Sequence, residues 1–270
     1  MVADGEKMAG SLEAAAACLR NATDQKTVTT PLRHDVAGAD AGADAALGYQ
    51  VQSVNVLHWT RAGRRPVGRK IALTTLAVQK LIGVDAPASG VLFDDMFLPS
   101  NSVIDGSQLN QARAEAEVAL VLKTGLPQSC PTYMDVLSAI DYAMPAIEIV
   151  DSRIRDWDLS AFDFIADNAA ARLVVLGDTP FDIRAHDLTT IGMSMTVDGT
   201  ERATGSGAEC MGSPLRALHW LAMDMARRGT PLQAGELIMA GALGAIVKIS
   251  QACRVEATIG RFAPVCVTFS

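Results

Sequence analysis

Two glutamates at strand spacing are the residues of this sequence best suited to chemistry. Glu115 and Glu117 lead into the apolar run 118–122, which is typical of a buried strand. Side chains at positions i and i+2 of a strand point to the same face, roughly 7 Å apart along the backbone. Two carboxylates beside a core repel each other and are costly to desolvate, and a bound divalent cation relieves both costs. The alternative is an ordinary Glu-x-Glu pair on the solvent face of an edge strand.

A third glutamate favours the metal site over a solvent-facing pair. Glu148 lies inside the short apolar segment 144–150, where solvent exposure does not explain a lone carboxylate. Three carboxylates without a nearby Cys or His suit a hard cation that prefers oxygen ligands, Mg²⁺ or Mn²⁺, better than zinc. We therefore predict that Glu115, Glu117 and Glu148 are metal ligands.

Composition narrows the class of protein. The 270 residues are 49% hydrophobic and 5% aromatic, which is ample for a core, and the net charge of -7 with no basic stripe argues against a nucleic-acid partner. The five cysteines are scattered without a CxxC pair, which predicts reduced thiols in a cytoplasmic protein. No apolar run approaches the ~18 residues of a membrane span, and no signal peptide is expected.

The hydrophobic pattern predicts helices first and mostly strands later. Helices are expected at 11–22, with Ser11 as N-cap, and at 43–61, followed by a strand and the short helix 76–82. Residues 83–99 are expected to form an irregular binding loop or lid.

The second part of the pattern completes the fold prediction. Strands are expected at 114–123, 144–150 and 172–177, helices at 132–141 and 213–229, a hairpin around Asp198-Gly199, and further strands within 236–269. This order predicts an α+β fold with a helical N-terminal region, 1–66, and a β-rich metal-binding catalytic domain, 67–270.

Six sequence blocks resemble a known family in order and spacing, from about residue 45 to the end. The blocks are Gly68-Arg69-Lys70-Ile71-Ala72-Leu73-Thr74, Gly90-Val91-Leu92-Phe93-Asp94-Asp95-Met96, Glu115-Ala116-Glu117, Glu148-Ile149-Val150-Asp151-Ser152-Arg153-Ile154, Ile165-Ala166-Asp167-Asn168-Ala169 and Gly241-Ala242-Leu243-Gly244. They are similar to those of the 2-keto-4-pentenoate hydratase / 4-oxalocrotonate decarboxylase family, within the fumarylacetoacetate hydrolase superfamily.

The resemblance implies a fold, a cofactor and a substrate class. It implies a distorted mixed β-roll body, a homo-oligomer and one Mg²⁺ or Mn²⁺ held by the three glutamates. The metal of such enzymes chelates a short 2-keto acid, and the residue matching Lys70 lies beside that substrate. The resemblance also leaves open an association with a partner enzyme of the same pathway of aromatic catabolism.

The implied reaction is lyase chemistry on a 2-keto acid. We expect a metal-dependent hydratase that adds water to a 2-hydroxydienoate, with decarboxylation of a 2-oxo-3-enedioate as the alternative. Lys70 is the predicted catalytic acid or base and a substrate-binding residue, against the alternative of a surface lysine. Asp94 and Asp167 are weaker substrate-binding candidates, because acidic loop residues are more often caps and turns.

Three alanines depart from the family pattern. Ala88 occupies the place of a usual acidic residue, Ala170 that of a usual serine, and Ala72 that of a usual glycine. The missing acid and hydroxyl are groups expected to position or deprotonate water. Their loss leaves a third alternative open, a non-catalytic or specialised biosynthetic member of the family.

Overall fold

Two β-sheets form the body of the molecule. The computed structural model describes residues 2–36, 44–250 and 252–270. The larger sheet has the order β2 (Ala88–Phe93), β1 (Pro66–Ala72), β10 (Leu237–Ala242), β5 (Arg113–Leu122), β6 (Ile140–Val150), β7 (Ala171–Leu176) and β3 (Phe97–Pro99), with β11 (Val247–Lys248) paired to β5. The smaller sheet has the order β4 (Ser102–Ile104), β13 (Val265–Phe269), β12 (Cys253–Ile259), β8 (Gly192–Val197) and β9 (Thr200–Ser206).

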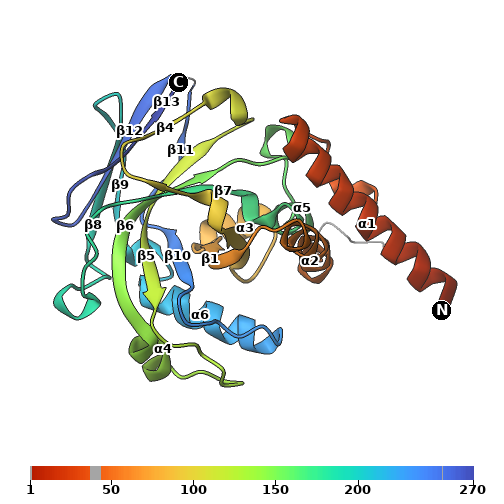
Figure 1. The fold of residues 1–270 in the computed structure, drawn as a ribbon, viewed down its shortest axis with the longest axis horizontal. Helices are drawn as coiled ribbons and strands as arrows, with labels where there is room; N and C mark the ends of the chain where they lie inside the picture. Colours follow the sequence, from red (N-terminus) through yellow and green to blue (C-terminus); the bar gives the residue numbers. More distant parts are fainter. Residues whose placement is uncertain (1, 37–43, 251) are drawn as a thin grey trace.

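The larger sheet is mixed and strongly curved, as the long strands β5 and β6 show in Figure 1. Most of its neighbouring strands pair antiparallel, but β1 with β10 and β3 with β7 pair parallel. In the smaller sheet, β4 pairs parallel with β13. Mixed pairing and curvature are the features expected of a distorted β-roll, so the predicted α+β fold class is confirmed.

Helices cover the open sides of the sheets. They are α1 (Val2–Gln25), α2 (Ala45–Arg61), α3 (Leu76–Ile82), α4 (Tyr133–Ala139), α5 (Ala161–Ala166) and α6 (Pro214–Arg227), with short 3-10 turns η1 (Leu32–His34), η2 (Asp94–Met96), η3 (Gly106–Gln108), η4 (Arg155–Trp157), η5 (Asn168–Ala170), η6 (Ile183–Ala185) and η7 (Gly207–Glu209). Within the described ranges, no helix combines the length and apolar character needed to cross a membrane.

The N-terminal helices share a core with the body. In Figure 1, α1 extends away at the right of the view. Leu12 and Leu19 of α1 and Val51 of α2 pack in one apolar cluster with Phe162 and Ala166 of α5. The helical region thus contributes to a core that it shares with the body. The predicted division into 1–66 and 67–270 stays a prediction.

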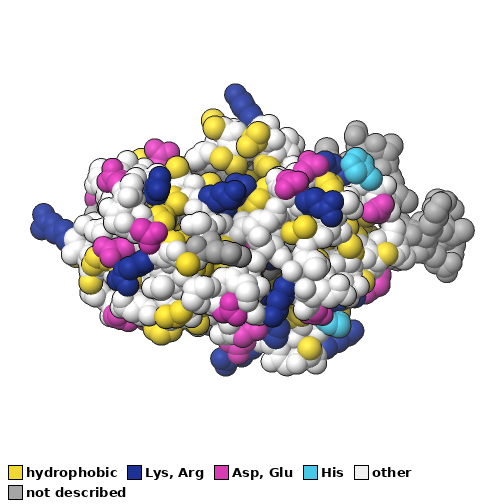
Figure 2. All heavy atoms as spheres, turned by 90° about the horizontal axis from the view of Figure 1, so that it is seen from above, with side chains coloured by type: hydrophobic (Ala, Val, Ile, Leu, Met, Phe, Trp, Pro, Cys, Tyr) yellow, Lys and Arg dark blue, Asp and Glu magenta, His cyan; other side chains and the backbone are white. Residues whose placement is uncertain are grey.

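Charged side chains are mixed on the surface. On the face drawn in Figure 2, Lys and Arg side chains (dark blue) and Asp and Glu side chains (magenta) are interspersed. This face is therefore not divided into one basic and one acidic region.

The alternation of β5 separates a core face from a polar face. Ala116, Val118 and Leu120 point into the large apolar cluster formed by residues of both sheets. The intervening residues, Glu115 and Glu117, therefore project from the opposite face of the same strand. The period of two, visible in the sequence, thus places both carboxylates on one side of the sheet.

Most predicted elements are confirmed. The predicted strands 114–123 and 172–177 correspond to β5 and β7, and the predicted hairpin around Asp198-Gly199 is β8–β9. Helix α6 begins at Pro214 after Ser213 in the N-cap position, although the Ser213 side chain makes no capping hydrogen bond. The predicted strand 144–150 is part of the longer β6, because α4 ends at Ala139 and the chain enters the sheet directly.

Two local predictions are wrong. Ser11 is not an N-cap, because α1 already begins at Val2. The segment 83–99 is not an irregular lid, because its apolar centre is the fully buried strand β2. Turn-forming residues before that strand obscured it, whereas its pairing with β1 supplies the hydrogen bonds of a regular sheet edge.

The turn at residues 168–170 has an unusual backbone conformation and packs against β2. Asn168, Ala169 and Ala170 all have positive φ, at 52°, 50° and 57°, a conformation that costs energy for residues other than glycine. The Asn168 side chain holds the turn in place, because its Oδ1 accepts from Val91 N at 2.8 Å and its Nδ2 donates to Val91 O at 2.9 Å. The turn lies so close to β2 that a Cβ at Gly90 would stand 2.5 Å from Asn168 O.

The substitution Gly90→Ala tests this close approach. The added methyl would meet Asn168 O at 2.5 Å and Lys70 Cγ at 3.1 Å, so we expect a loss of about 1–3 kcal/mol in the free energy of unfolding. Urea denaturation measures it. The matched control is Gly192→Ala, because a Cβ there meets nothing within 4 Å, and its effect should stay within about 0.5 kcal/mol. Equal effects of the two substitutions would contradict the close approach.

Candidate active site

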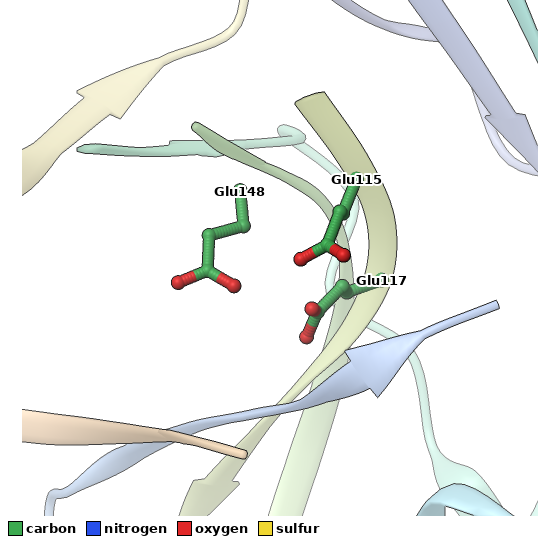
Figure 3. A group of neighbouring side chains, drawn as sticks. All are labelled: Glu115, Glu117 and Glu148. Carbon is green, nitrogen blue, oxygen red and sulfur yellow. The ribbon is translucent and has the colours of Figure 1, made fainter. Parts of the chain in front are cut away.

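Strand pairing brings the three glutamates together. β5 and β6 run antiparallel with Glu115 directly opposite Glu148, and Glu117 follows two residues along β5 on the same face. Each carboxylate offers one oxygen, and these oxygens all lie within 4.8 Å of one another. Figure 3 shows Glu115 and Glu117 projecting from one strand toward the carboxylate of Glu148.

The carboxylates are short of hydrogen-bond partners. Glu117 and Glu148 are fully buried, whereas Glu115 is partly exposed. Glu117 Oε2 accepts from Gly241 N at 2.8 Å, but Glu117 Oε1 and both carboxylate oxygens of Glu148 make no hydrogen bond in the described structure. Buried polar atoms are normally satisfied, so these oxygens fit a group that accepts lone pairs. An all-oxygen donor set suits a hard divalent cation.

Burial and mutual repulsion raise the pKa of the glutamates. Loss of solvent raises the pKa of Glu148 to about 7, with the Lys70 charge opposing and the Glu115 charge adding to that rise. Desolvation and the charges of Glu148 and Glu115 raise the pKa of Glu117 well above its ordinary value. The cluster therefore holds protons readily unless positive charge is supplied.

Lys70 is the cation that faces the cluster. Its Nζ lies 3.3 Å from Glu148 Oε2, and its side chain is 2% exposed. Burial alone would lower its pKa, but the charges of Glu148, Glu115 and Glu117 outweigh burial and raise the pKa. Lys70 and, beside Glu115, Arg113 offset part of the charge of the three carboxylates, and the negative charge that remains suits a bound cation.

The strained turn orients Lys70. Lys70 Nζ donates to Ala169 O at 3.0 Å, and Ala169 is the middle residue of the positive-φ turn. The ammonium group is thus fixed between a backbone carbonyl and Glu148. Lys70 also lines the adjoining cavity, so its ammonium group can donate to a ligand there as well.

Asp167 and Asp94 have other partners in the structure. Asp167 is buried under the turn, where its Oδ1 pairs with Arg153 Nε at 2.5 Å and its Oδ2 accepts from Arg153 N at 2.9 Å. Asp94 is exposed at the far end of β2 and lies 3.5 Å from Arg65 Nε. Neither lines the cavity, so we do not carry their predicted substrate-binding roles into the proposed site.

A cavity of about 650 Å³ opens beside the glutamates. Its floor comes from the larger sheet and includes Lys70, Ala72 and Glu115. The remaining walls come from α3, from the segment around Trp157 and Phe164, and from the loop 244–246. A small molecule in this cavity can therefore reach both the carboxylate cluster and the lysine.

Sequence reasoning missed Arg113 and Trp157. Arg113 lines the cavity two residues before Glu115, and its guanidinium lies 4.1 Å from the centre of the Trp157 ring. The Trp157 ring is itself fixed, because its Nε1 donates to Gln111 O at 3.1 Å. The period of two along β5 was a signal that could have identified Arg113. Trp157 comes from a distant turn, and no local pattern indicates it.

The three alanine departures lie close together. Ala72 and Ala88 are paired across β1 and β2, on the same face as Lys70. Ala88 packs in one buried cluster with Ala169 and Ala170. Ala72 and Ala170 line the main cavity, whereas Ala88 lines a second cavity of about 530 Å³ next to Tyr49 and Arg228. Two of the three departures therefore line the same cavity as Lys70.

Sequence comparison supports the resemblance. The profile of the fumarylacetoacetate (FAA) hydrolase C-terminal family matches residues 78–268. The chain is 44% identical over 260 residues to 2-keto-4-pentenoate hydratase 1 of Dechloromonas aromatica strain RCB, covering 96% of this chain and 97% of that protein. It is 45% identical over 237 residues to 2-keto-4-pentenoate hydratase of Paraburkholderia xenovorans strain LB400, covering 88% and 87%.

Structural comparison agrees. 4-Oxalocrotonate decarboxylase from Pseudomonas putida G7, complexed with magnesium and adipate, matches with a TM-score of 0.90 and 29% identity over 96% of this chain and 97% of that one. Fumarylpyruvate hydrolase from Pseudomonas aeruginosa matches with a TM-score of 0.59 and 14% identity over 75% and 88%, which shows the shared fold alone. The chain belongs to the fumarylacetoacetate hydrolase superfamily, and within it to the family of the 2-keto-4-pentenoate hydratases and 4-oxalocrotonate decarboxylases.

Proposed function

We propose that this protein is a Mg²⁺-dependent hydratase of a 2-hydroxy-2,4-dienoate. The observation that carries the proposal is the convergence of three carboxylates with Lys70 beside a cavity, two of them buried and incompletely hydrogen-bonded. Relatives at 44–45% identity are named hydratases, and the two structures of the decarboxylase relative contain magnesium or calcium. Mn²⁺ has the same preference for oxygen ligands and is the second candidate ion.

The residues of this chain divide the work between binding and proton transfer. Glu115, Glu117 and Glu148 would hold the cation, which supplies a Lewis acid that polarises the carbonyl group of a 2-keto acid. Lys70 Nζ, fixed by Ala169 O and Glu148, is placed to hold a substrate oxygen or to carry a proton.

The proposed reaction consumes one water molecule and otherwise requires only proton transfers, without an oxidant or a reductant. Ketonisation moves the enol proton of the dienoate to C5 and leaves a 2-oxo-3-enoate. Water then adds its oxygen at C4 while a proton goes to C3, which yields a 4-hydroxy-2-oxo acid. Lys70 is the side chain of the described cavity lining best placed to carry either proton, because it is buried, cationic and adjacent to the carboxylates.

Decarboxylation of a 2-oxo-3-enedioate is the second candidate. The structural relative at a TM-score of 0.90 is named a decarboxylase and holds adipate, a dicarboxylate. In this chain Arg113 adds one guanidinium to the cavity lining, and a guanidinium can bind a second carboxylate. The non-catalytic or biosynthetic alternative rests on Ala88 and Ala170, whose positions beside Lys70 lack the usual acid and hydroxyl.

Assembly and location remain proposals as well. We infer a homo-oligomer, with an association with a partner pathway enzyme as a further possibility, from the family resemblance. We infer a cytoplasmic location because all five cysteines are free thiols, as a reducing compartment requires.

The first prediction concerns activity. With 2-hydroxypenta-2,4-dienoate and Mg²⁺, the diene absorbance should disappear and the 4-hydroxy-2-oxo acid should form, and EDTA should abolish both changes. CO₂ release from a 2-oxo-3-enedioate without turnover of any dienoate would contradict the hydratase proposal and support the decarboxylase. Failure of both reactions in protein that binds Mg²⁺ would favour the non-catalytic alternative.

A second prediction follows from the raised pKa of Glu148. Its pKa of about 7 in the cation-free protein means that the carboxyl is largely protonated below pH 7, and a protonated carboxyl does not ligate a cation. Mg²⁺ affinity should therefore fall as the pH drops from near 8 to near 6, with proton release on binding. Calorimetry in buffers of different ionisation enthalpy measures both. Affinity independent of pH would contradict the ligand role of Glu148.

The third prediction separates Lys70 from the metal ligands. Lys70→Met removes the ammonium group but leaves all three glutamates, so kcat should fall by about 100-fold or more while Mg²⁺ still binds. Glu148→Gln should instead weaken Mg²⁺ binding by about tenfold or more. Steady-state kinetics and calorimetry on both variants distinguish the roles. A Lys70→Met enzyme with unchanged kcat would exclude Lys70 from proton transfer.

A further inference from the structure

The cavity is larger than a five-carbon keto acid requires. Its volume of about 650 Å³ lies in the range of roughly 300–1,000 Å³ found for sites that hold drug-sized ligands. A short dienoate anchored at the glutamates would occupy only one end of this space. The remaining volume is therefore available to a substituent of the substrate.

The walls of this remaining volume are mainly apolar. Val78, Leu81 and Ile82 line the cavity from α3, and Leu159 lines it from the segment before α5. Phe164 lines it at the Lys70 end, where its ring centre lies 5.9 Å from Lys70 Nζ. The apolar lining continues to the rim, which exposes large hydrophobic side chains. Leu81 is 81% exposed, Val78 40% and Ile246 37%. A ligand that covers these side chains gains the free energy of apolar burial.

The lining carries more acidic than basic side chains, which favours an uncharged substituent over a second carboxylate. Asp156 and Glu209 are exposed acidic residues of the same cavity, and they would repel a second carboxylate of a ligand. Lys70 is already paired with Glu148. Arg113 is the other basic residue in the described lining, and it lies beside Glu115 on the same face of β5, at the metal-binding end.

We propose that the substrate is a 2-keto acid with an extended, uncharged apolar substituent at the end remote from its carboxylate. Val78, Leu81 and Ile246 bind that substituent. This inference rests on the proposed function, because the glutamate cluster is taken to anchor the keto-acid end. It assigns a specificity role to α3, whose cavity-lining residues Val78 and Leu81 are 40% and 81% exposed.

A chain-length series tests the proposal on the Mg²⁺-loaded full-length protein. The probes are 2-oxobutanoate, 2-oxohexanoate, 2-oxooctanoate and 2-oxoadipate, with affinities measured by calorimetry. Affinity should rise about fourfold for each methylene that is buried, and 2-oxoadipate should bind more weakly than 2-oxohexanoate. Affinity that is flat with length, or tighter binding of 2-oxoadipate, would overturn the apolar substituent. If no 2-oxo acid binds in a Mg²⁺-dependent way, the proposed function itself fails.

A pair of variants on one helix locates the binding surface. Leu81 lines the cavity, whereas Leu76 is 74% exposed on the same helix α3 and does not line it. In Leu81→Ser the ratio of 2-oxooctanoate to 2-oxobutanoate affinity should fall about fivefold or more, and in Leu76→Ser it should not change. Native mass is measured for both variants. An equal fall in both, or a fall only where the assembly has dissociated, contradicts the assignment.

Discussion

The antiparallel pairing of β5 with β6 is the interaction on which the site depends. It sets Glu115 against Glu148 and leaves Glu117 on the same face, so three like charges share one buried space. A buried carboxylate carries a desolvation penalty of several kcal/mol even after relaxation. Lys70 and the Gly241 N–H offset part of it, but three carboxylate oxygens remain without a hydrogen bond. The pairing therefore produces a buried cluster of carboxylates that additional positive charge would stabilise.

The rest of the site positions one ammonium group against that cluster. The Arg153–Asp167 pair lies under the positive-φ turn, and Asn168 ties the turn to β2. This turn places Ala169 O where it accepts a hydrogen bond from Lys70 Nζ. Strain concentrated at a functional position persists when the surroundings over-determine it, and here a buried ion pair and a side-chain clamp do so. Asp167 thus supports the backbone of the turn through its pairing with Arg153.

The carboxylate cluster and the class of fold could be predicted from the sequence. Period-two alternation around Glu115 and Glu117, and a glutamate inside an apolar run at Glu148, reflect the strand geometry directly. Chain segments distant in sequence could not be placed in this way. The Ala169 carbonyl that fixes Lys70 lies 99 residues away, and Trp157, which stacks on Arg113, comes from a separate turn. The ion pair of Asp167 with Arg153 could not be predicted either, because no local pattern indicates it.

The family resemblance indicated the class of reaction. It did not indicate which substrate fits, because that depends on the side chains that line the cavity. Ala72 and Ala170 line the space beside Lys70, and the apolar side chains of α3 extend it toward solvent. In the proposed function, these residues would select among 2-keto acids, whereas the glutamates would hold the cation that anchors the keto-acid group. The anchoring part of the site and the selecting part therefore depend on different segments of the chain.

Anomalous diffraction from crystals grown with Mn²⁺ tests the central claim most directly. We expect one anomalous peak per chain, with oxygens of Glu115, Glu117 and Glu148 as ligands at about 2.0–2.2 Å. A map without a peak between these three side chains, with Mn²⁺ bound elsewhere or not at all, would contradict the account.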